Sequence, residues 1–140
     1  MEIINLTTKQ QWRESFPIMK ELRTHLTEKD YIADLEHMAQ NGYSLVACVD
    51  NGEMQALAGF VTDRSFAWGN YVWVHDLVTS STARSKGYGA YVLNYIEQWA
   101  RGQGYEKVIL SSGLQREQAH HFYEHKVDMK KKSYVFQKKL

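Results

Sequence analysis

One glycine-bearing segment, Asp76–Ala90, combines residue types and spacing that suit phosphate binding. An apolar, β-branched run leads into a short polar loop, and an amphipathic helical pattern begins around Gly87 and Gly89. The first N–H groups of a helix have no intrahelical acceptor, and the helix dipole adds partial positive charge there. Glycine lets the backbone approach a phosphate, while Arg84 and Lys86 supply formal charge. The segment therefore predicts an anion site between a strand and a helix.

Two common phosphate motifs do not fit this segment. A dinucleotide fingerprint needs a third glycine where Val92 stands, and the Gly-Lys-Ser/Thr ending of a P-loop is absent. The segment instead resembles motif A of the GNAT superfamily of N-acetyltransferases, an Arg/Gln-x-x-Gly-x-Gly/Ala loop that holds the pyrophosphate of acetyl-coenzyme A. The resemblance, closest to small bacterial members, extends to Leu77-Val78-Thr79, Arg84-Ser85, Ser112-Gly113-Leu114-Gln115-Arg116 and Ala119-His120-His121-Phe122-Tyr123.

Hydrophobic periodicity and turn residues predict the elements that position this loop. The expected strands are Glu2–Leu6, Ser44–Asp50, Met54–Thr62, Tyr71–Thr79, Lys107–Ser111 and Lys132–Lys138. The expected helices run from a cap at Thr7 or Thr8 through Leu22, from a cap at Thr27 to Asn41-Gly42, over Ser85–Gln103 and over Arg116–Glu124. Pro17 should kink or split the first helix.

This order of elements predicts an α/β domain with a mixed, mostly antiparallel central sheet and helices on both faces. It is also the order of the GNAT fold, which the resemblance implies over nearly the whole chain. We find no repeat, linker or low-complexity tract, so residues 1–140 are expected to form a single acetyltransferase domain.

Composition excludes several other classes. The net charge of +1 gives no global attraction to nucleic acid or membranes, and no apolar run approaches the length of a membrane span. The N-terminus does not have the pattern of a signal peptide, so a cytoplasmic protein is expected. The single cysteine, Cys48, allows neither an internal disulfide nor a cysteine-based zinc site. His121 and His125 have i,i+4 spacing, but they lack the Glu of an HExxH motif and a third ligand nearby. No metal is expected.

The resemblance implies acetyl-CoA as the acetyl donor and assigns residues to bind it. Arg84, Ser85, Lys86, Gly87, Tyr88 and Gly89 would form the pyrophosphate loop. The pantetheine arm would lie between the fourth and fifth strands. A bulge in the fourth strand would free a backbone N–H for the thioester carbonyl, with Leu77, Val78 and Thr79 acting through their backbone.

Two side chains are candidates for proton transfer. Tyr123 matches the tyrosine that GNAT enzymes often use as general acid toward the leaving thiolate, and a phenol with a pKa near ~10 stays protonated at neutral pH. Asp76 is the best candidate for the general base, with its neighbour His75 on the opposite face of the strand. A structural carboxylate that bonds backbone groups around the bulge is an equal alternative for Asp76. In that case water or direct binding of the free amine would replace the base.

The resemblance places one wall of the acceptor pocket on the first two helices, which makes Arg23, His25 and Tyr31 candidate substrate contacts. It implies direct transfer to a primary amine of a small molecule or peptide in a ternary complex, and it is compatible with a homodimer. An inactive acetyl-CoA-binding sensor or regulatory module is the main alternative, and a nucleic-acid-binding protein is disfavoured by the charge. The sequence departs from the family at Arg116, where many members have Asn, and at Lys126–Met129, which lacks a glycine.

Overall fold

The structure, a computed structural model, describes residues 1–140. The chain divides into two compact units, Met1–Ile109 and Leu110–Leu140, so the prediction of a single domain stays a prediction. The elements in chain order are β1 (Glu2–Asn5), α1 (Lys9–Leu22), α2 (Glu28–Gln40), β2 (Ser44–Asp50), β3 (Glu53–Ser65), β4 (Gly69–Thr79), α3 (Tyr88–Gln103), β5 (Lys107–Leu110) and α4 (Glu117–His125).

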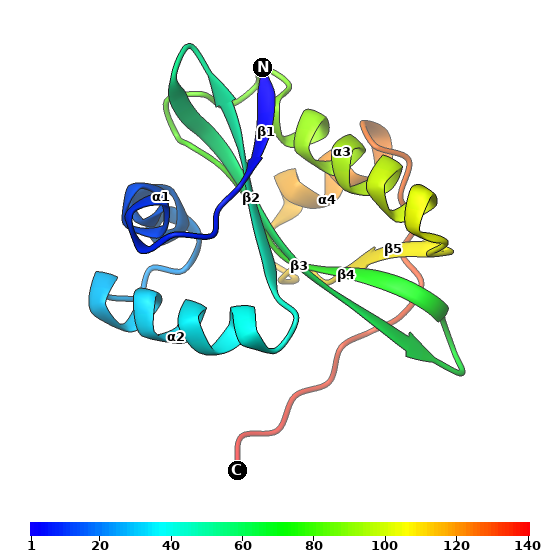
Figure 1. Ribbon diagram of the computed structural model, residues 1–140. Helices are drawn as coiled ribbons and strands as arrows, with labels where there is room; N and C mark the ends of the chain where they lie inside the picture. The colour runs from blue at the N-terminus through cyan, green and yellow to red at the C-terminus, as the bar shows by residue number, and fades with distance from the viewer. The chain divides into compact units, whose positions relative to one another are not determined.

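The sheet has the order β1-β2-β3-β4-β5, and the pairs from β1 to β4 are antiparallel. The β2–β3 hairpin turns at Asn51-Gly52, where both residues have positive φ angles of 53° and 77°. Helices α1 and α2 lie on one side of the sheet and α3 lies on the other (Figure 1). The predicted mixed α/β architecture with helices on both faces is confirmed.

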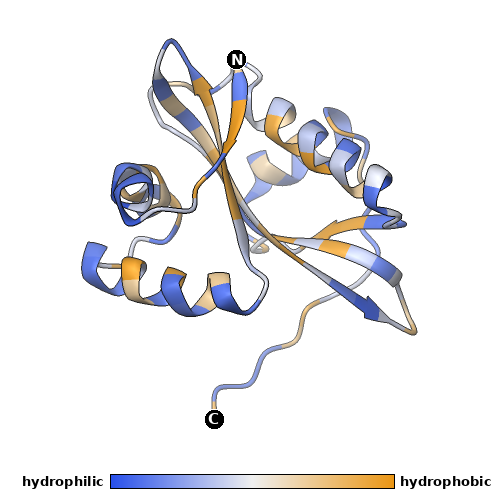
Figure 2. Ribbon diagram, in the orientation of Figure 1, coloured by the Kyte–Doolittle hydropathy of each residue, from blue (hydrophilic) through white to orange (hydrophobic).

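Alternation along the strands gives the first unit an apolar layer on each face of the sheet. On the α1–α2 side, Leu45, Ala47 and Leu57 join one buried cluster with residues of both helices. On the α3 side, the rings of Phe60 and Trp99 lie 5.3 Å apart. Figure 2 shows the apolar residues of α3 on the side toward the sheet. These two layers hold the strands and helices that carry the candidate site.

Side-chain caps start the first two helices where the sequence predicts them. Thr8 and Gln11 form a reciprocal capping box at α1, and the Thr27 side chain accepts from the Asp30 N–H at α2. Helix α1 runs without interruption through Pro17, so the predicted split is wrong, whereas the other predicted outcome, a kink, stays a prediction. The reason that the helix is not split is packing, because residues on both sides of the proline are buried and hold both halves of the helix in place. They are Trp12 and Ser15 before it and Ile18 and Met19 after it.

Helix α3 begins at Tyr88, later than the predicted start at Ser85. Ser85 has φ 65° and Gly87 has φ 86°, and both angles lie in the left-handed region, which a right-handed helix does not use. The segment before Tyr88 is therefore a loop. At its other end α3 stops at Gly104, also left-handed with φ 86°.

The second unit contains α4 and a C-terminal segment without regular structure. The strand predicted over Lys132–Lys138 is absent. Three consecutive apolar residues, Tyr134, Val135 and Phe136, are 82%, 69% and 92% exposed, and no backbone hydrogen bond involves a residue beyond Met129. A strand exists only where a neighbour pairs with its backbone, so β-favouring residues alone do not form one.

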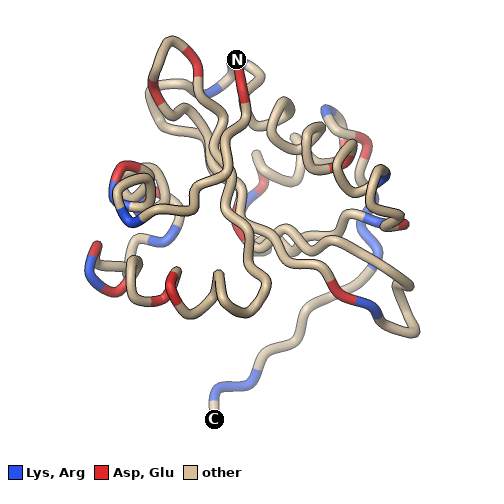
Figure 3. The backbone as a smooth tube through the Cα atoms, in the orientation of Figure 1, with Lys and Arg blue, Asp and Glu red and all other residues tan.

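Charged residues of both signs are interspersed over the helices of the first unit, and the inner strands carry few of them (Figure 3). This pattern agrees with the net charge of +1. None of the helices combines the length and the apolar character that a membrane span requires.

Candidate functional site

The loop between β4 and α3 is fixed to its surroundings where it leaves the strand. The Ser80 N–H donates to the Gln55 carbonyl at 2.8 Å, which extends the pairing with β3. The Ser81 N–H donates to Oε1 of Glu21 on α1 at 2.9 Å. Ala83 is buried at 2% exposure and anchors the middle of the loop. The glycine-bearing part that follows therefore starts from a defined position.

The N-terminus of α3 presents backbone donors without protein acceptors. The Tyr91 N–H makes the first intrahelical bond, to the Gly87 carbonyl at 3.0 Å. The preceding N–H groups, those of Tyr88, Gly89 and Ala90, have no acceptor in the helix. A Cβ built on Gly87 would meet nothing within 4 Å, so the space beside the loop is open. Unpaired donors beside open space suit a phosphate.

The side chains of the loop divide into two groups. Arg84 is 63% exposed and lies 3.6 Å from the Glu21 carboxylate, and Ser85 and Lys86 are also exposed. Tyr88 is instead buried, and its hydroxyl donates to Asp50 at 2.7 Å. That hydrogen bond, followed by desolvation, raises the pKa of the Tyr88 hydroxyl. Among the predicted cofactor residues, Tyr88 thus anchors the helix start, and Arg84, Ser85 and Lys86 face solvent.

The end of β4 has a second set of backbone groups without a strand partner on one side. Leu77, Val78 and Thr79 pair with β3, on the other side of the strand. The neighbour β5 has only 4 residues, and the Glu106 N–H before it bonds the Asn70 carbonyl at 2.9 Å, near the start of β4. At 3.3 Å per residue, β5 spans roughly 13 Å, whereas Leu77 lies roughly 23 Å beyond Asn70. β5 therefore cannot pair with the end of β4.

A bulge interrupts β4 just before these residues. Gly59 on β3 is opposite Asp76, but the next residue, Phe60, is opposite Val74, so His75 has no partner across the ladder. Such an insertion disrupts the ladder locally and bends the strand. The structure thus has a bulge in the strand where the family resemblance implied one.

The carboxylate of Asp76, beside this bulge, is bound by two side chains from other elements. Arg23, the C-cap of α1, donates from Nε to Oδ1 at 2.9 Å, and its Nη2 donates to the His75 carbonyl at 2.8 Å. The hydroxyl of Tyr43, which precedes β2, donates to Oδ2 at 2.6 Å. The side chain of Asp76 is 12% exposed and that of Arg23 is 41% exposed. We call these three residues the Arg23–Asp76–Tyr43 junction.

The junction bears on the two roles left open for Asp76. Each carboxylate oxygen already accepts a hydrogen bond, from Arg23 or from Tyr43. These two bonds are what a structural carboxylate requires, except that the donors are side chains of α1 and of the segment before β2 and not backbone groups. Each oxygen of an ionised carboxylate can accept more than one hydrogen bond, so the general-base role of Asp76 stays a prediction.

The remaining predicted acceptor contacts differ in their access to solvent. His25 is exposed in the turn between α1 and α2. Tyr31 is buried at 4% exposure, and its hydroxyl is 2.7 Å from Oγ of Ser15. Desolvation raises the pKa of Tyr31 to about 12, the Ser15 hydrogen bond acts in the opposite direction, and the charge of Asp76 adds to the increase. Arg23 and His25 can thus face a ligand directly, whereas Tyr31 supports the packing of the two helices.

The predicted general acid, Tyr123, lies on α4 in the second unit. Its ring packs edge-on against that of Phe122, with centroids 5.5 Å apart, and its backbone carbonyl accepts from the Met129 N–H at 2.8 Å. Burial raises the pKa of the Tyr123 hydroxyl above its ordinary value, and the Arg116 guanidinium acts in the opposite direction. A phenol with a raised pKa stays protonated at neutral pH, as a proton donor must.

Two residues were not identified from the sequence: Tyr43, a member of the junction, and Gly59, which lies against the Tyr43 ring. Tyr43 follows the turn glycine Gly42 and has no motif around it. Gly59 lies inside β3, and a Cβ there would fall 1.6 Å from the Tyr43 hydroxyl oxygen. A glycine inside an apolar strand often marks a bulge or a close approach by another group. That signal was available in the sequence, but it does not say which group approaches.

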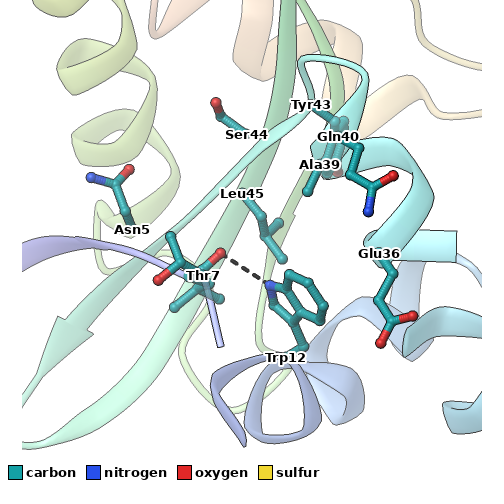
Figure 4. Close-up of a pocket in the computed structure, with 10 residues that line it drawn as sticks. Asn5, Thr7, Trp12, Glu36, Ala39, Gln40, Tyr43, Ser44 and Leu45 are labelled. Atoms are coloured by element: carbon teal, nitrogen blue, oxygen red, sulfur yellow. Dashed lines mark hydrogen bonds between the residues drawn. The ribbon is translucent and has the colours of Figure 1, made fainter. Parts of the chain in front are cut away.

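A groove of about 600 Å³ lies on the first unit, between the β1–α1 connection, α2 and the start of β2, and Tyr43 of the junction is part of its lining. Figure 4 shows Trp12 and Leu45 at its apolar part and Glu36 and Gln40 on α2. The indole N–H of Trp12 donates to the Leu6 carbonyl at 3.0 Å and is not free for a ligand. None of the residues predicted for the site lines this groove.

The unpaired N–H groups at the start of α3, the bulge in β4 and the unpaired end of that strand are features that the family resemblance implied. A sequence profile of the acetyltransferase (GNAT) family matches residues 7–128. The chain belongs to this family. It is also 46% identical over 134 residues to the uncharacterized N-acetyltransferase YhdJ of Bacillus subtilis, and this match covers 95% of the chain and 94% of that protein. The protein is accordingly an N-acetyltransferase of the GNAT family.

Solved structures agree on the fold at low sequence identity. A transcriptional regulator from Bacillus halodurans superposes with a TM-score of 0.86 at 15% identity, with 99% of each chain covered. The aminoglycoside N-acetyltransferase AAC(6′)-Iy, solved in complex with CoA, superposes with a TM-score of 0.84 at 12% identity, covering 99% of this chain and 93% of that one. At these identities the likeness concerns the fold alone.

Proposed function

We propose that this GNAT protein transfers the acetyl group of acetyl-CoA directly to a primary amine in a ternary complex. The observation that supports it most is that one loop joins two sets of unpaired backbone groups. The loop begins at Thr79, at the unpaired end of β4, and ends at Gly87, where the free N–H groups of α3 begin. Acetyl-CoA supplies an acetyl group already activated as a thioester.

The residues of the loop suit the donor's phosphates. The N–H groups of Tyr88 and Gly89 would donate to the pyrophosphate, next to the open space at Gly87. Arg84 and Lys86 are exposed and would add charge-assisted bonds. The contact of Arg84 with Glu21, 3.6 Å long and exposed, is weak enough for a phosphate to replace it.

The end of β4 suits the extended part of the donor. Backbone groups of Leu77, Val78 and Thr79 on the side away from β3 would bond the amides of the pantetheine arm, as an added strand would. A backbone N–H beside the bulge at His75 would donate to the thioester carbonyl oxygen as negative charge develops on it. Both roles belong to the backbone and do not depend on side-chain identity.

For proton transfer, Tyr123 is the proposed donor to the departing thiolate, since a phenol is protonated at neutral pH and can donate a proton. In this proposal the amine arrives neutral or loses its proton to water, and Asp76, which Arg23 and Tyr43 already bind, holds the structure around it. On the acceptor side, His25 is exposed at the α1–α2 turn and the side chain of Arg23 is 41% exposed, and both would contact the acceptor.

The test combines binding with turnover. Calorimetric titration with acetyl-CoA should show binding, and a thiol-release assay over amino acids, polyamines, aminoglycosides and peptide amines should identify an acceptor. Binding without thiol release from any amine would indicate an acetyl-CoA-binding module instead of an enzyme. Absence of binding would overturn the assignment of the loop.

A further inference from the structure

We propose that Tyr43 is a positioning residue: with Arg23 it holds Asp76 in place and thereby fixes the bulge of β4 against the α1–α2 wall. The consequence for acetyl transfer rests on the proposed function. The structural part rests on geometry alone and can be tested without an acceptor.

The space made for the Tyr43 ring points to this role. A Cβ on Gly59 would lie 1.6 Å from the hydroxyl oxygen and 2.2 Å from Cζ of Tyr43. Gly59 is also the residue opposite Asp76 in the ladder. The ring therefore crosses β3 at a position without a side chain and reaches the carboxylate on the next strand. Any other residue at this position would block the contact.

The carboxylate of Asp76 joins segments that are far apart in the sequence. Asp76 on β4 binds Arg23 at the end of α1 and Tyr43 before β2. Hydrogen bonds to an ionised group are stronger than those between neutral groups, and Tyr43 is only 8% exposed, so water competes little for its bond. The two carboxylate oxygens of Asp76 thus connect β4 to the end of α1 and to the segment before β2.

Arg23 links the junction to the bulge itself. It contacts Asp76 through Nε and the carbonyl of His75, the bulged residue, through Nη2. The peptide between His75 and Asp76 is planar, so a fixed carbonyl fixes the direction of the N–H on its other side. Tyr43 holds the carboxylate of Asp76 where Arg23 can bond it, and Arg23 can then also donate to the His75 carbonyl of this peptide. The orientation of the backbone at the bulge therefore depends on the Tyr43 hydroxyl.

The decisive experiment compares Tyr43→Phe with Ser15→Ala. Both variants remove a buried hydroxyl from the same core. Ser15 bonds Tyr31 and the Trp12 carbonyl and does not touch Asp76. Amide hydrogen exchange is measured over the peptide 72–79 in the full chain. We expect exchange there to become roughly tenfold faster or more in Tyr43→Phe, because loss of the hydrogen bond to Asp76 makes local opening of this part of β4 easier. In Ser15→Ala, exchange of the same peptide should stay at the wild-type rate.

Equal exchange of this peptide in the two variants would overturn the positioning role, whatever the activity. Where an acceptor is known, kcat/KM for the amine should fall about tenfold in Tyr43→Phe while acetyl-CoA affinity stays within a factor of two. A wild-type protein without any acceptor would refute the proposed function and leave the exchange result decisive. Should Tyr43→Phe fail to fold, Arg23→Gln breaks the same junction from α1 and is measured in the same way.

Discussion

Two polar regions at the end of β4 are built in opposite ways. In the Arg23–Asp76–Tyr43 junction, each carboxylate oxygen has a donor, and those donors come from other elements of the chain. At the start of α3, the N–H groups of Tyr88 and Gly89 have no protein acceptor, and the space beside Gly87 is open. Along the chain, Asp76 directly precedes Leu77–Thr79 and the start of α3 follows it after the loop.

This contrast indicates that one region positions the backbone and the other binds a ligand. Polar groups away from water are normally paired, so a region that satisfies its own groups is complete without a ligand. A region that leaves a row of donors unpaired lowers its free energy when an anion arrives. The junction is therefore expected to set geometry and the α3 start to set cofactor affinity. Substitutions in each region, and at the proton donor outside both, test this division.

The largest effect is expected outside both regions, at Tyr123. Tyr123 is the proposed proton donor to the departing thiolate, so Tyr123→Phe should lower turnover by ~10²-fold or more. Acetyl-CoA affinity should barely change, since the ring and its contact with Phe122 remain. Steady-state kinetics with calorimetric titration measures both. A turnover within a factor of two of wild type would mean that Tyr123 serves packing only, and that the acid must be sought in the junction or at the α3 start.

The next effect concerns the open region. Arg84→Ala removes one charge-assisted contact to the pyrophosphate, worth roughly 1.5–3 kcal/mol, so acetyl-CoA should bind about 10- to 150-fold more weakly. Stability should hardly change, because Arg84 is 63% exposed and its contact with Glu21 is an exposed ion pair. Calorimetric titration of acetyl-CoA gives the affinity, and thermal unfolding gives the stability.

Arg101→Ala is the matched control for this measurement. Arg101 is an exposed arginine in the last turn of the same helix, at the end away from the loop. Its loss changes the net charge equally and should leave acetyl-CoA affinity unchanged. Equal weakening by both variants would indicate a general electrostatic effect and would refute a specific phosphate contact at Arg84.

The open region could be predicted from the sequence, because its signal is local. Glycines, basic residues and a strand-to-helix transition stand next to one another between Thr79 and Gly89, and the backbone of such a loop follows from the residue types. The helix caps at Thr8 and Thr27 were predicted correctly for the same reason. Each of these features is decided within a few residues.

The junction could not be predicted in this way, because its members are distant in sequence. Arg23, Tyr43 and Asp76 meet only after the sheet has formed, and none of them stands in a motif that names the others. The absence of the strand predicted over Lys132–Lys138 also depends on contacts between distant segments. Its β-favouring residues are a local signal, but pairing with another segment decides whether a strand forms.

Gly59→Ala tests the closed region through its stability. The added methyl would collide with the Tyr43 ring, and such overpacking costs about 1–3 kcal/mol of unfolding free energy. In a Tyr43→Leu background the collision is relieved and the cost should largely disappear. Urea denaturation of the four proteins gives the coupling energy.

Gly102→Ala serves as the control for that cycle. Gly102 lies inside α3, and a Cβ added there would meet nothing within 4 Å, so alanine should stabilise the protein by about 0.5–1 kcal/mol. Opposite signs for the two glycine substitutions would locate the steric demand at Tyr43. A cost at Gly59 that persists in the Tyr43→Leu background would show that β3 itself, and not the ring, requires glycine.

The smallest effect is a loss of stability in alkali, next to the junction. The pKa of Tyr31 is raised from 10.0 to about 12, first by burial and in part by the charge of Asp76. Above pH 10 the unfolded chain releases this proton while the folded protein keeps it. The contribution of Tyr31 to stability is therefore complete below pH 10 and is lost as the pH rises toward 12, by about 1 kcal/mol at pH 11. Urea denaturation at pH 9 and pH 11 should show a smaller decrease for Tyr31→Phe than for wild type by that amount. The other tyrosines titrate in both proteins, so their contributions cancel in the difference. Equal decreases in the two proteins would mean that Tyr31 ionises as readily as an exposed phenol and is not enclosed beside Asp76.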